Sequence, residues 1–404
     1  MKILHTSDWH LGQYFMMKTR EAEHLAFLNW LITVVIEEEI DALIVAGDIF
    51  DSTTPPSYAR KLYSDFIVKL QATECLQLII VSGNHDSVAV LNESKNLLSA
   101  LNVSLLAGLS TDLQEHLIPL KNKKREQMIV CALPFLRAQD VMSSEQGISA
   151  EQKQLNLQQG IQHTYQKIYQ LAKEQNSSLP VIATGHLTAV GCSVSESVRD
   201  IYIGTLTAFP ASLFPDFDYI ALGHLHRPQK VQKQDHIRYS GSPIALSFDE
   251  TKQDKQVLIA EFNSQGLTDV KPLNIPIFQQ LQILSGDLDS VTQQLAALLD
   301  ECLNNKQKSI WLEIKLQQAF YLSDVQSRLN TMVEDSCIEI LKISSPQVNE
   351  ASQWQETEVA SLDALTPHQL FQHRIACEEN LSEEQQGELT NLFSQVCAEI
   401  EEQL

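Results

Sequence analysis

Short apolar runs alternate with longer amphipathic stretches along residues 1–274. An apolar run of about 4–8 residues is typical of a buried strand, and apolar positions three and four residues apart are typical of a helix. The pattern predicts strands at 3–6, 42–46, 76–81, 128–133, 181–184, 219–222, 237–240 and 256–262. It predicts helices at 20–38, 57–70, 88–101 and 151–176. Apolar strands between helices indicate an α/β fold whose sheet is covered on both faces.

The pattern changes after residue 274. Residues 275–343 combine a helical stretch at 288–303 with a strand-like run at 309–314, which predicts a small α+β domain. Residues 344–366 are polar and lack periodicity, so we expect a linker there. Residues 367–404 are predicted to be a helical tail, on which an apolar stripe is formed by Leu389, Phe393, Val396 and Ile400.

The formal net charge of −22, taken alone, argues against nucleic acid as a partner, because Lys and Arg supply affinity for phosphates. The charge is uneven, since residues 275–404 hold 21 acidic and 6 basic residues, whereas residues 1–274 hold 30 acidic and 23 basic residues. Acidic side chains that bind cations would also be neutralised. The net charge is therefore weak evidence about the substrate.

The cysteines favour a reducing, cytoplasmic setting. All seven are scattered and none is spaced as Cys-x-x-Cys, which argues against both a disulfide framework and a thiolate zinc site. No apolar run approaches the ~18 residues that span a bilayer. Polar residues follow the first apolar run at once, so we expect neither a membrane segment nor a secretory signal.

Small polar clusters follow five of the predicted strands, at 7–10, 47–51, 83–86, 185–186 and 223–226. In open α/β sheets this edge is where ligands bind. Imidazole nitrogens with carboxylate and amide oxygens suit Mn²⁺, Fe²⁺ or Zn²⁺. The candidate ligands are Asp8, His10, Asp48, Asn84, His186, His224 and His226. They are too many for one four-coordinate ion and suit two ions if one carboxylate bridges them.

The spacing inside these clusters would let neighbouring side chains bind the same ion. In Asp8-x-His10 and His224-x-His226, the paired side chains would point to the same side of a continuing strand and could reach one ion. A glycine precedes Asp48, and glycines also precede the ligands at 84, 186 and 224. We expect these glycines to let the backbone turn sharply at each strand end.

The ordered clusters D-x-H, G-D-x-x-D, G-N-H-D, G-H and G-H-x-H resemble the calcineurin-like metallophosphoesterases. Four further runs resemble the SbcD nuclease family: HTSDWHLG at 5–12, REAEH at 20–24, VRDIYIG at 198–204 and YSGSP at 239–243. The resemblance covers the whole chain and is strongest before residue 275. It implies a sandwich of two sheets flanked by helices, followed by a small α+β capping domain and a C-terminal helical tail.

The resemblance also implies which residues bind metal. The first ion would be held by Asp8, His10 and His226, and the second by Asn84, His186 and His224. Asp48 would bridge the two ions. Both would be divalent, with Mn²⁺ preferred and Fe²⁺ or Zn²⁺ accepted by the same donors.

The implied activity is a DNA nuclease, with exonuclease action on duplex ends and endonuclease action on single-stranded or hairpin DNA. A hydroxide between the ions would attack the phosphodiester in line. His85, which follows a ligand, would stabilise the scissile phosphate or protonate the leaving oxygen. Asp51, three residues after Asp48, would orient His85, as an Asp at this offset does in the related phosphoprotein phosphatases.

Two other functions stay open at this point. A phosphoprotein or small-nucleotide phosphoesterase would have the same fold. Those phosphatases follow the second Asp with Arg-Gly, which binds phosphate, whereas Ser52 and Thr53 follow Asp51 here. A non-catalytic scaffold for an ATPase is the other alternative, but it would need none of the metal ligands.

The resemblance further implies partners. The C-terminal stripe either docks on the coiled-coil ATPase SbcC, where the acidic tail would meet basic residues, or folds back on the core. The helices at 57–70 and 88–101 either form a homodimer within a heterotetramer or pack on their own sheet. The apolar surface in question is that of Tyr63, Phe66, Ile67 and Leu70. A cytoplasmic, nucleoid-associated protein is expected.

Several other polar residues have simpler expected roles. His5 and His24 are expected to be structural, and the histidines at 116, 163, 236, 368 and 373 are expected at the surface. Asp86 either supports the metal site from behind or caps the helix that follows. Arg199 either contacts the substrate backbone or forms an ordinary ion pair.

Overall fold

The computed structural model describes residues 1–142, 149–193, 198, 208–305, 309–317 and 322–345, together with residues 371, 389, 390, 392 and 393. The chain divides into one unit at Met1–Ser345 and a second at Pro346–Leu404. Most of the predicted linker and helical tail, and Arg199, lie outside the described residues. In the part that is described, no helix has the length and apolarity needed to cross a membrane.

The first sheet contains six strands, in the order β14-β13-β1-β4-β5-β6. Its four parallel strands are β1 (Lys2–Thr6), β4 (Ala42–Ala46), β5 (Gln77–Val81) and β6 (Val103–Leu106). The antiparallel strands β13 (Gln256–Asn263) and β14 (Gly266–Asn274) extend one edge. Strands β4 and β5 are almost wholly apolar because both faces of the sheet are covered, whereas β1 also carries the buried polar residues His5 and Thr6.

The second sheet also contains six strands, in the order β11-β12-β10-β9-β8-β7. Its parallel core consists of β8 (Gln127–Cys131), β9 (Val181–His186), β10 (Tyr219–Gly223) and β12 (Ile237–Tyr239). The antiparallel edge strands are β7 (Leu117–Lys121) and β11 (Gln229–Lys230). The two sheets pack face to face through apolar side chains that include Ile44, Val81, Ile182 and Ala221.

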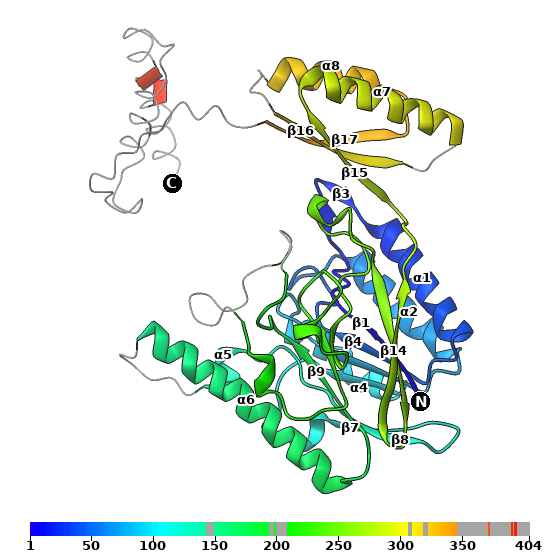
Figure 1. Ribbon diagram of the computed structural model, residues 1–404, viewed down its shortest axis with the longest axis vertical. Helices are drawn as coiled ribbons and strands as arrows, with labels where there is room; N and C mark the ends of the chain where they lie inside the picture. The colour runs from blue at the N-terminus through cyan, green and yellow to red at the C-terminus, as the bar shows by residue number, and fades with distance from the viewer. Residues whose placement is uncertain are drawn as a thin grey trace. The chain divides into compact units, whose positions relative to one another are not determined.

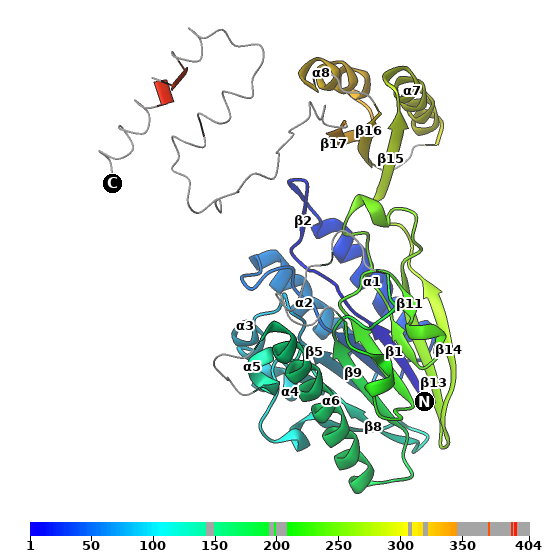
Figure 2. The same ribbon diagram turned by 60° about the vertical axis from the view of Figure 1, so that its left-hand side comes forward.

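Helices cover the outer face of each sheet (Figures 1 and 2). On the first sheet they are α1 (Glu21–Glu37), α2 (Ser57–Gln71), α3 (Val88–Asn92) and α4 (Lys95–Ser99). On the second sheet they are α5 (Ala138–Val141) and α6 (Ala150–Gln175). Short 3₁₀ turns are η1 (Leu113–His116), η2 (Ala211–Leu213), η3 (Val231–Lys233) and η4 (Phe248–Glu250). The predicted helix at 88–101 is thus two short helices.

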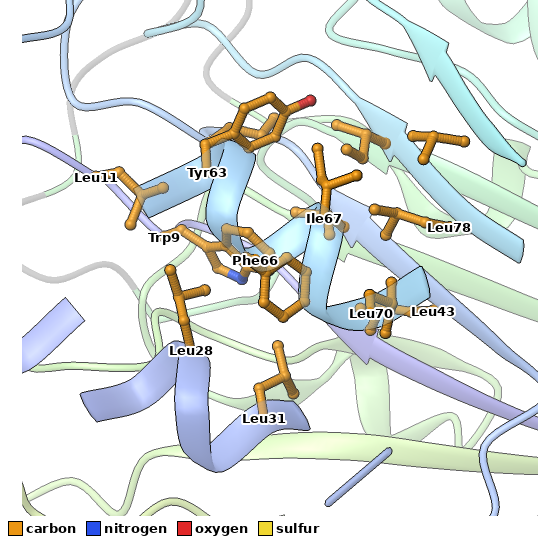
Figure 3. Packing of buried hydrophobic residues seen from close by; sticks show 14 of the residues in the cluster. Trp9, Leu11, Leu28, Leu31, Leu43, Tyr63, Phe66, Ile67, Leu70 and Leu78 are labelled. Atoms are coloured by element: carbon orange, nitrogen blue, oxygen red, sulfur yellow. The ribbon is translucent and has the colours of Figure 1, made fainter. Parts of the chain in front are cut away.

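The apolar face of α2 packs on its own sheet. Tyr63, Phe66, Ile67 and Leu70 are all buried, and Figure 3 shows them against Trp9 and the side chains of α1 and the strands. Of the two alternatives for this helix, packing on its own sheet therefore holds for these four side chains. The outward apolar residues of this region are instead Val68 on α2, which is 65% exposed, and Leu97 on α4, which is 69% exposed.

A three-stranded parallel sheet follows the sandwich. Its elements are β15 (Gln280–Gly286), α7 (Leu288–Asn305), β16 (Ile310–Leu316), α8 (Leu322–Val333) and β17 (Ile338–Ser344). It has its own apolar core between the sheet and both helices. A small hairpin of β2 (Tyr14–Phe15) and β3 (Lys18–Thr19) contacts it. There Phe15 stacks on Trp311 and packs edge-on against Phe248.

One histidine lies where the sequence did not predict it. His116 is fully buried rather than at the surface. Its Nε2 accepts the backbone N–H of Ser110, and its Nδ1 donates to the carbonyl oxygen of Ala132. Both ring nitrogens are therefore satisfied without water, which offsets the cost of burial. His163 is exposed and His236 is partly exposed, while residues 368 and 373 lie outside the described part of the chain.

Candidate metal centre

The seven candidate ligands meet where the carboxyl ends of the parallel strands of both sheets lie close together. Asp8 and His10 follow β1, and Asp48 follows β4. Asn84 follows β5 on the same sheet, His186 ends β9, and the pair at 224 and 226 follows β10 on the other sheet. Parallel strands end at a common edge, so residues far apart in the chain come together there.

The first group consists of Asp8, His10 and His226. One ligand atom from each lies within 4.8 Å of the others, and all three side chains are buried. The rings of His10 and His226 meet edge to face with centroids 5.0 Å apart. Three donors at this separation can reach a single ion.

The second group consists of Asp48, His186 and His224, whose ligand atoms also lie within 4.8 Å of one another. Asn84 joins this group, because its Oδ1 lies 2.9 Å from His186 Nε2 and 3.2 Å from His224 Nδ1. The amide oxygen thus points into the space between the two imidazoles. The group holds the residue types that a second divalent ion would need.

Asp48, a member of the second group, also lies near His10 of the first group. Its Oδ2 is 3.1 Å from Nε2 of His186 and 3.6 Å from Nε2 of His10. Its Oδ1 accepts the backbone N–H of His85 at 2.9 Å. A single carboxylate therefore contacts one member of each group, which is the position that a bridging ligand would take.

The backbone at these residues is unusual. Asp8, His10, Asp48 and His224 all have positive φ, between 46° and 97°. Such conformations cost non-glycine residues roughly 1–3 kcal/mol each and are concentrated at functional sites. The expectation that Asp8 and His10 share a side of a continuing strand is wrong, since β1 ends at Thr6. Both residues have positive φ, and their ligand atoms lie within 4.8 Å of one another.

The residues fit divalent cations. His10 Nε2 is buried and has no hydrogen-bond partner among the described residues, yet it lies near the Asp48 carboxylate. A buried polar atom without a partner costs free energy, and a cation between it and the carboxylates would remove that cost. The donor set contains nitrogens and oxygens and no thiolate, as Mn²⁺, Fe²⁺ and Zn²⁺ accept.

The buried carboxylates and imidazoles of the site shift one another's pKa values. Burial acts to raise the pKa of Asp48, but His186 and then His10 hold it well below its usual value. Burial acts to lower the pKa of His186, and Asp48 outweighs it and raises that pKa to about 9. For His224, burial and the neighbouring His186 hold the pKa well below its usual value. Asp48 and then Asp8 thus favour positive charge at the position of His186.

The chain is similar to proteins of known family. The calcineurin-like phosphoesterase family model matches residues 1–228. The SbcD subunit of nuclease SbcCD from Escherichia coli K12 is 44% identical over 400 residues, which cover 98% of this chain and 97% of that protein. The chain belongs to the SbcD family of calcineurin-like phosphoesterases.

Other SbcD family members agree along most of the chain. The SbcD subunit of nuclease SbcCD from Rhodobacter capsulatus is 36% identical, and the match covers 74% of this chain and 75% of that protein. The Bacillus subtilis counterpart is 29% identical, with 80% and 81% covered. A model described as the type 5 capsule protein repressor C-terminal domain matches residues 277–379. A solved dimetal phosphatase from Danio rerio aligns with a TM-score of only 0.40 at 12% identity, over 68% of this chain and 98% of that one.

In this SbcD family chain, His85 lies beside the first group. Its ring meets that of His10 edge to face at 4.7 Å, and its exposed fraction is 9%. His85 Nδ1 donates to the backbone carbonyl oxygen of Asp51 at 2.7 Å. The Asp51 carboxylate lies 3.2 Å from His10 Nδ1. Asp51 therefore contacts two histidines, one through its main chain and one through its side chain.

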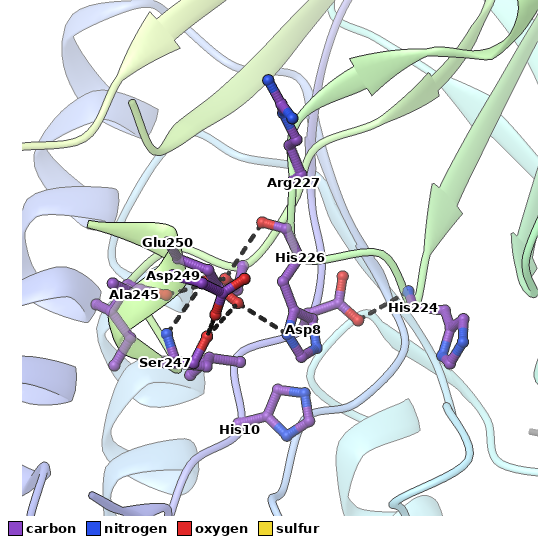
Figure 4. A network of polar contacts seen from close by, with 12 residues as sticks. Asp8, His10, His224, His226, Arg227, Ala245, Ser247, Asp249 and Glu250 are labelled. Carbon is purple, nitrogen blue, oxygen red and sulfur yellow. Dashed lines mark hydrogen bonds and ion pairs between the residues drawn. The ribbon is translucent and has the colours of Figure 1, made fainter. Parts of the chain in front are cut away.

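Two buried carboxylates support the centre and were not predicted as ligands. Asp86 accepts backbone N–H groups from Gly83, Ile49 and Phe50, so it holds two of the ligand-bearing loops together. It does not cap the following helix, since that cap is Ser87. Glu250 lies beside His226 (Figure 4). Glu250 was missed because no spacing motif links a residue 24 positions later to the ligand cluster.

Proposed function

We propose that this chain is a metal-dependent phosphodiesterase that cuts DNA, as the nuclease component of a complex with a coiled-coil ATPase. The proposal rests above all on two buried ligand groups that meet at Asp48. It is supported by full-length similarity to the SbcD subunit of nuclease SbcCD from Escherichia coli K12. Exonuclease action on duplex ends and endonuclease action on single-stranded and hairpin DNA are the activities proposed.

Two divalent ions would be held by the seven candidate ligands. Asp8, His10 and His226 would hold one, and Asn84, His186 and His224 would hold the other, with Asp48 between them. We propose Mn²⁺, although the same donors accept Fe²⁺ and Zn²⁺. When bound, the ions would supply Lewis acidity and a water that is acidic enough to react at neutral pH.

His85 would handle the proton on the leaving group. A carbonyl oxygen can only accept, so the contact with Asp51 keeps the proton on Nδ1 of His85. Nε2 is then the nitrogen that can give or take a proton at the substrate. Asp51 would orient His85 through its main chain and His10 through its carboxylate.

The chain would be organised as a nuclease domain at 1–274, a capping domain at 275–343, a linker at 344–366 and a partner-docking helical element at 367–404. The start of a separate family match at residue 277 supports a boundary there. The helical element would bind an SbcC-type ATPase. A cytoplasmic, nucleoid-associated location follows from the proposed DNA substrate.

A homodimer within the heterotetramer would use the outer face of α2 and α4. A groove of about 210 Å³ there is lined mainly by apolar side chains, and Val68 and Leu97 stand exposed along it. Burying such residues between two copies would remove apolar surface from water.

A phosphoprotein or small-nucleotide phosphoesterase is the alternative enzyme. Ser52 and Thr53, in place of Arg-Gly, leave that alternative without its phosphate-binding arginine. The deciding experiment is digestion of duplex, hairpin and single-stranded DNA with and without Mn²⁺, beside a phosphopeptide. Cleavage of the phosphopeptide alone would overturn the nuclease proposal. A non-catalytic scaffold would leave every substrate intact.

His85→Ala tests the assigned mechanism. The variant should lose about 10²–10⁴-fold of the Mn²⁺-dependent DNA cleavage rate, because a general acid supplies roughly that factor. Mn²⁺ content and thermal unfolding should stay near those of the wild type, since His85 is not one of the seven proposed ligands. His163→Ala, an exposed change on α6, is the matched control and should cleave normally. Unchanged cleavage by His85→Ala would refute the role of His85.

A further inference from the structure

A buried ion pair, formed by Glu250 and Lys255, lies beside the candidate ligand His226. Glu250, at the end of η4, is completely buried, and Lys255 is 9% exposed. Lys255 Nζ lies 2.6 Å from Glu250 Oε2. The same ammonium group donates to Ser242 Oγ at 2.9 Å and to the backbone carbonyl oxygen of His226 at 3.1 Å. Its three protons therefore have three acceptors.

The pair reaches the metal centre through one residue, His226. Glu250 Oε1 lies 3.4 Å from His226 Nδ1, while Lys255 contacts the main-chain oxygen of the same residue. Figure 4 shows Glu250 on one side of the His226 ring and the Asp8 carboxylate on the other. The imidazole and the main chain of His226 are thus held by opposite members of one ion pair.

The Glu250 carboxylate is itself firmly placed. Its Oε2 also accepts the backbone N–H of Leu246 at 3.1 Å and lies 3.4 Å from Ser242 Oγ. Its Oε1 lies 3.4 Å from Ser247 Oγ. A side chain with this many partners has little freedom to turn away from His226.

Folding alone does not account for such a pair. Taking two charges out of water costs several kcal/mol per ion, and apolar residues of similar size often stabilise a fold as well or better. The arrangement does match a recurring need of metal sites, in which a carboxylate accepts the N–H on the imidazole nitrogen that does not bind the metal. Such a carboxylate fixes the tautomer and the ring orientation.

Two other histidines of the centre, His10 and His186, have comparable supports. His10 Nδ1 lies 3.2 Å from the Asp51 carboxylate, and His186 Nδ1 lies 3.0 Å from the carbonyl oxygen of Ala46. In each case an oxygen faces Nδ1. Nε2, on the opposite side of the ring, is then the nitrogen available as a ligand.

We propose that Glu250 is a positioning residue that presents His226 Nε2 to an ion bound by the first group (Asp8, His10 and His226). Lys255 would hold Glu250 and the His226 main chain in place. The inference rests on the proposed function, because it assumes that the first group binds a metal ion. It predicts that Glu250 controls one of the two ion sites and leaves the other intact.

The test measures Mn²⁺ binding by calorimetry on the purified full-length protein and on Glu250→Gln. We expect wild type to bind two ions and the variant to bind one of them about 10–100-fold more weakly, the range seen when such supporting groups are changed. The matched control is Glu23→Gln, because Glu23 is a buried carboxylate paired with Arg20 at 2.5 Å. It should unfold more easily in chelator yet bind both ions normally.

Each outcome decides the question. Two unchanged Mn²⁺ affinities in Glu250→Gln, or equal losses in Glu250→Gln and Glu23→Gln, would overturn the positioning role. No Mn²⁺ binding by the wild type would overturn the proposed function as well. Because Glu250→Gln leaves Lys255 buried without its partner, the double variant Glu250→Gln/Lys255→Met serves if the single variant fails to fold. It removes both charges, and the same loss at one site is expected.

Discussion

Several ionisable side chains buried in this protein are compensated by a neighbour of opposite charge. Asp48 is held in its charged form by His186 and His10, although burial acts against the charge. Asp86 has the opposite balance, since burial and the nearby Asp48 raise its pKa to about 6 despite three backbone N–H donors. Removing one member of such a set leaves another buried and unbalanced, which costs more than the lost contact alone.

His5 provides a pH-dependent test of burial away from the ligands. Its Nδ1 lies 2.9 Å from the Tyr219 hydroxyl and its Nε2 lies 3.2 Å from the carbonyl oxygen of Leu222. Burial lowers its pKa from 6.5 to about 3. Below pH 6.5 the unfolded chain therefore binds a proton that the folded chain does not, so stability falls as the pH drops from 6.5 towards 3.

The prediction compares wild type with His5→Gln in urea unfolding at pH 7 and pH 5. Because one pKa unit corresponds to 1.36 kcal/mol, wild type should lose about 2 kcal/mol more of its unfolding free energy between these pH values than the variant does. Chelator in all samples removes metal effects. His163→Gln, at an exposed position, should keep the wild-type dependence. An identical pH dependence in His5→Gln would contradict the prediction.

At the scale of elements, the glycines at the strand ends are needed mostly because they are small, and less because their backbone is flexible. Of the four glycines expected to permit sharp turns, only Gly47 has a left-handed backbone, with φ of +94°. At Gly83 and Gly223 the requirement is space. A Cβ at Gly83 would lie 2.1 Å from Asp48 Oδ1, and one at Gly223 would lie 1.9 Å from the carbonyl oxygen of Ala46.

Gly47→Ala tests this requirement against Gly191→Ala. Both glycines have left-handed φ, so each alanine should cost about 1–2 kcal/mol of unfolding free energy from backbone strain. A Cβ at Gly191 would meet nothing within 4 Å, whereas one at Gly47 would lie 2.1 Å from His186 Nδ1. We therefore expect Gly47→Ala to lose clearly more stability in denaturant unfolding and to bind Mn²⁺ more weakly. Equal losses in the two variants would show that the close approach to His186 is unimportant.

The sequence predicted those elements whose signal is local. Buried strands such as β4 and β10 are short runs without charged or amide side chains and were found within a few residues of their ends. The β2–β3 hairpin was missed because Met16 and Met17 form its turn with positive φ at both positions, where Gly or Asn is the usual signal. Its geometry depends on contacts with distant parts of the chain.

At the scale of the molecule, the features of the candidate site with a local sequence signal could likewise be predicted, and those that depend on folding could not. The candidate ligands could be selected from the sequence because each lies at the end of a strand or shortly after it, and parallel strands share an edge. The division into two groups, and the position of Asp48 near both, could be recognised only once the packing of the two sheets was known. Glu250 and Lys255 could not be predicted, since their relation to His226 exists only in the folded chain.

Because the ligands come from both sheets, bound ions would join the two layers. We expect 1 mM Mn²⁺ to raise the melting temperature of the wild type above its value in chelator. An ion at a hundred times its dissociation constant adds about 2.7 kcal/mol to the unfolding free energy. Asp48→Asn, which weakens both groups, should lose most of this gain. Equal melting temperatures for wild type in Mn²⁺ and in chelator would contradict the prediction.

Trp311 gives the chain an internal optical probe. Its indole stacks on Phe15 at a centroid distance of 5.8 Å, and the Arg20 guanidinium lies 5.6 Å from it. Trp9, by contrast, is sealed in the core of the sandwich. If the three-stranded sheet swung away from the hairpin, Trp311 would enter water and its emission would move to longer wavelength. Phe15 is five residues beyond His10, so this shift in emission would report movement next to the loop that carries a candidate metal ligand.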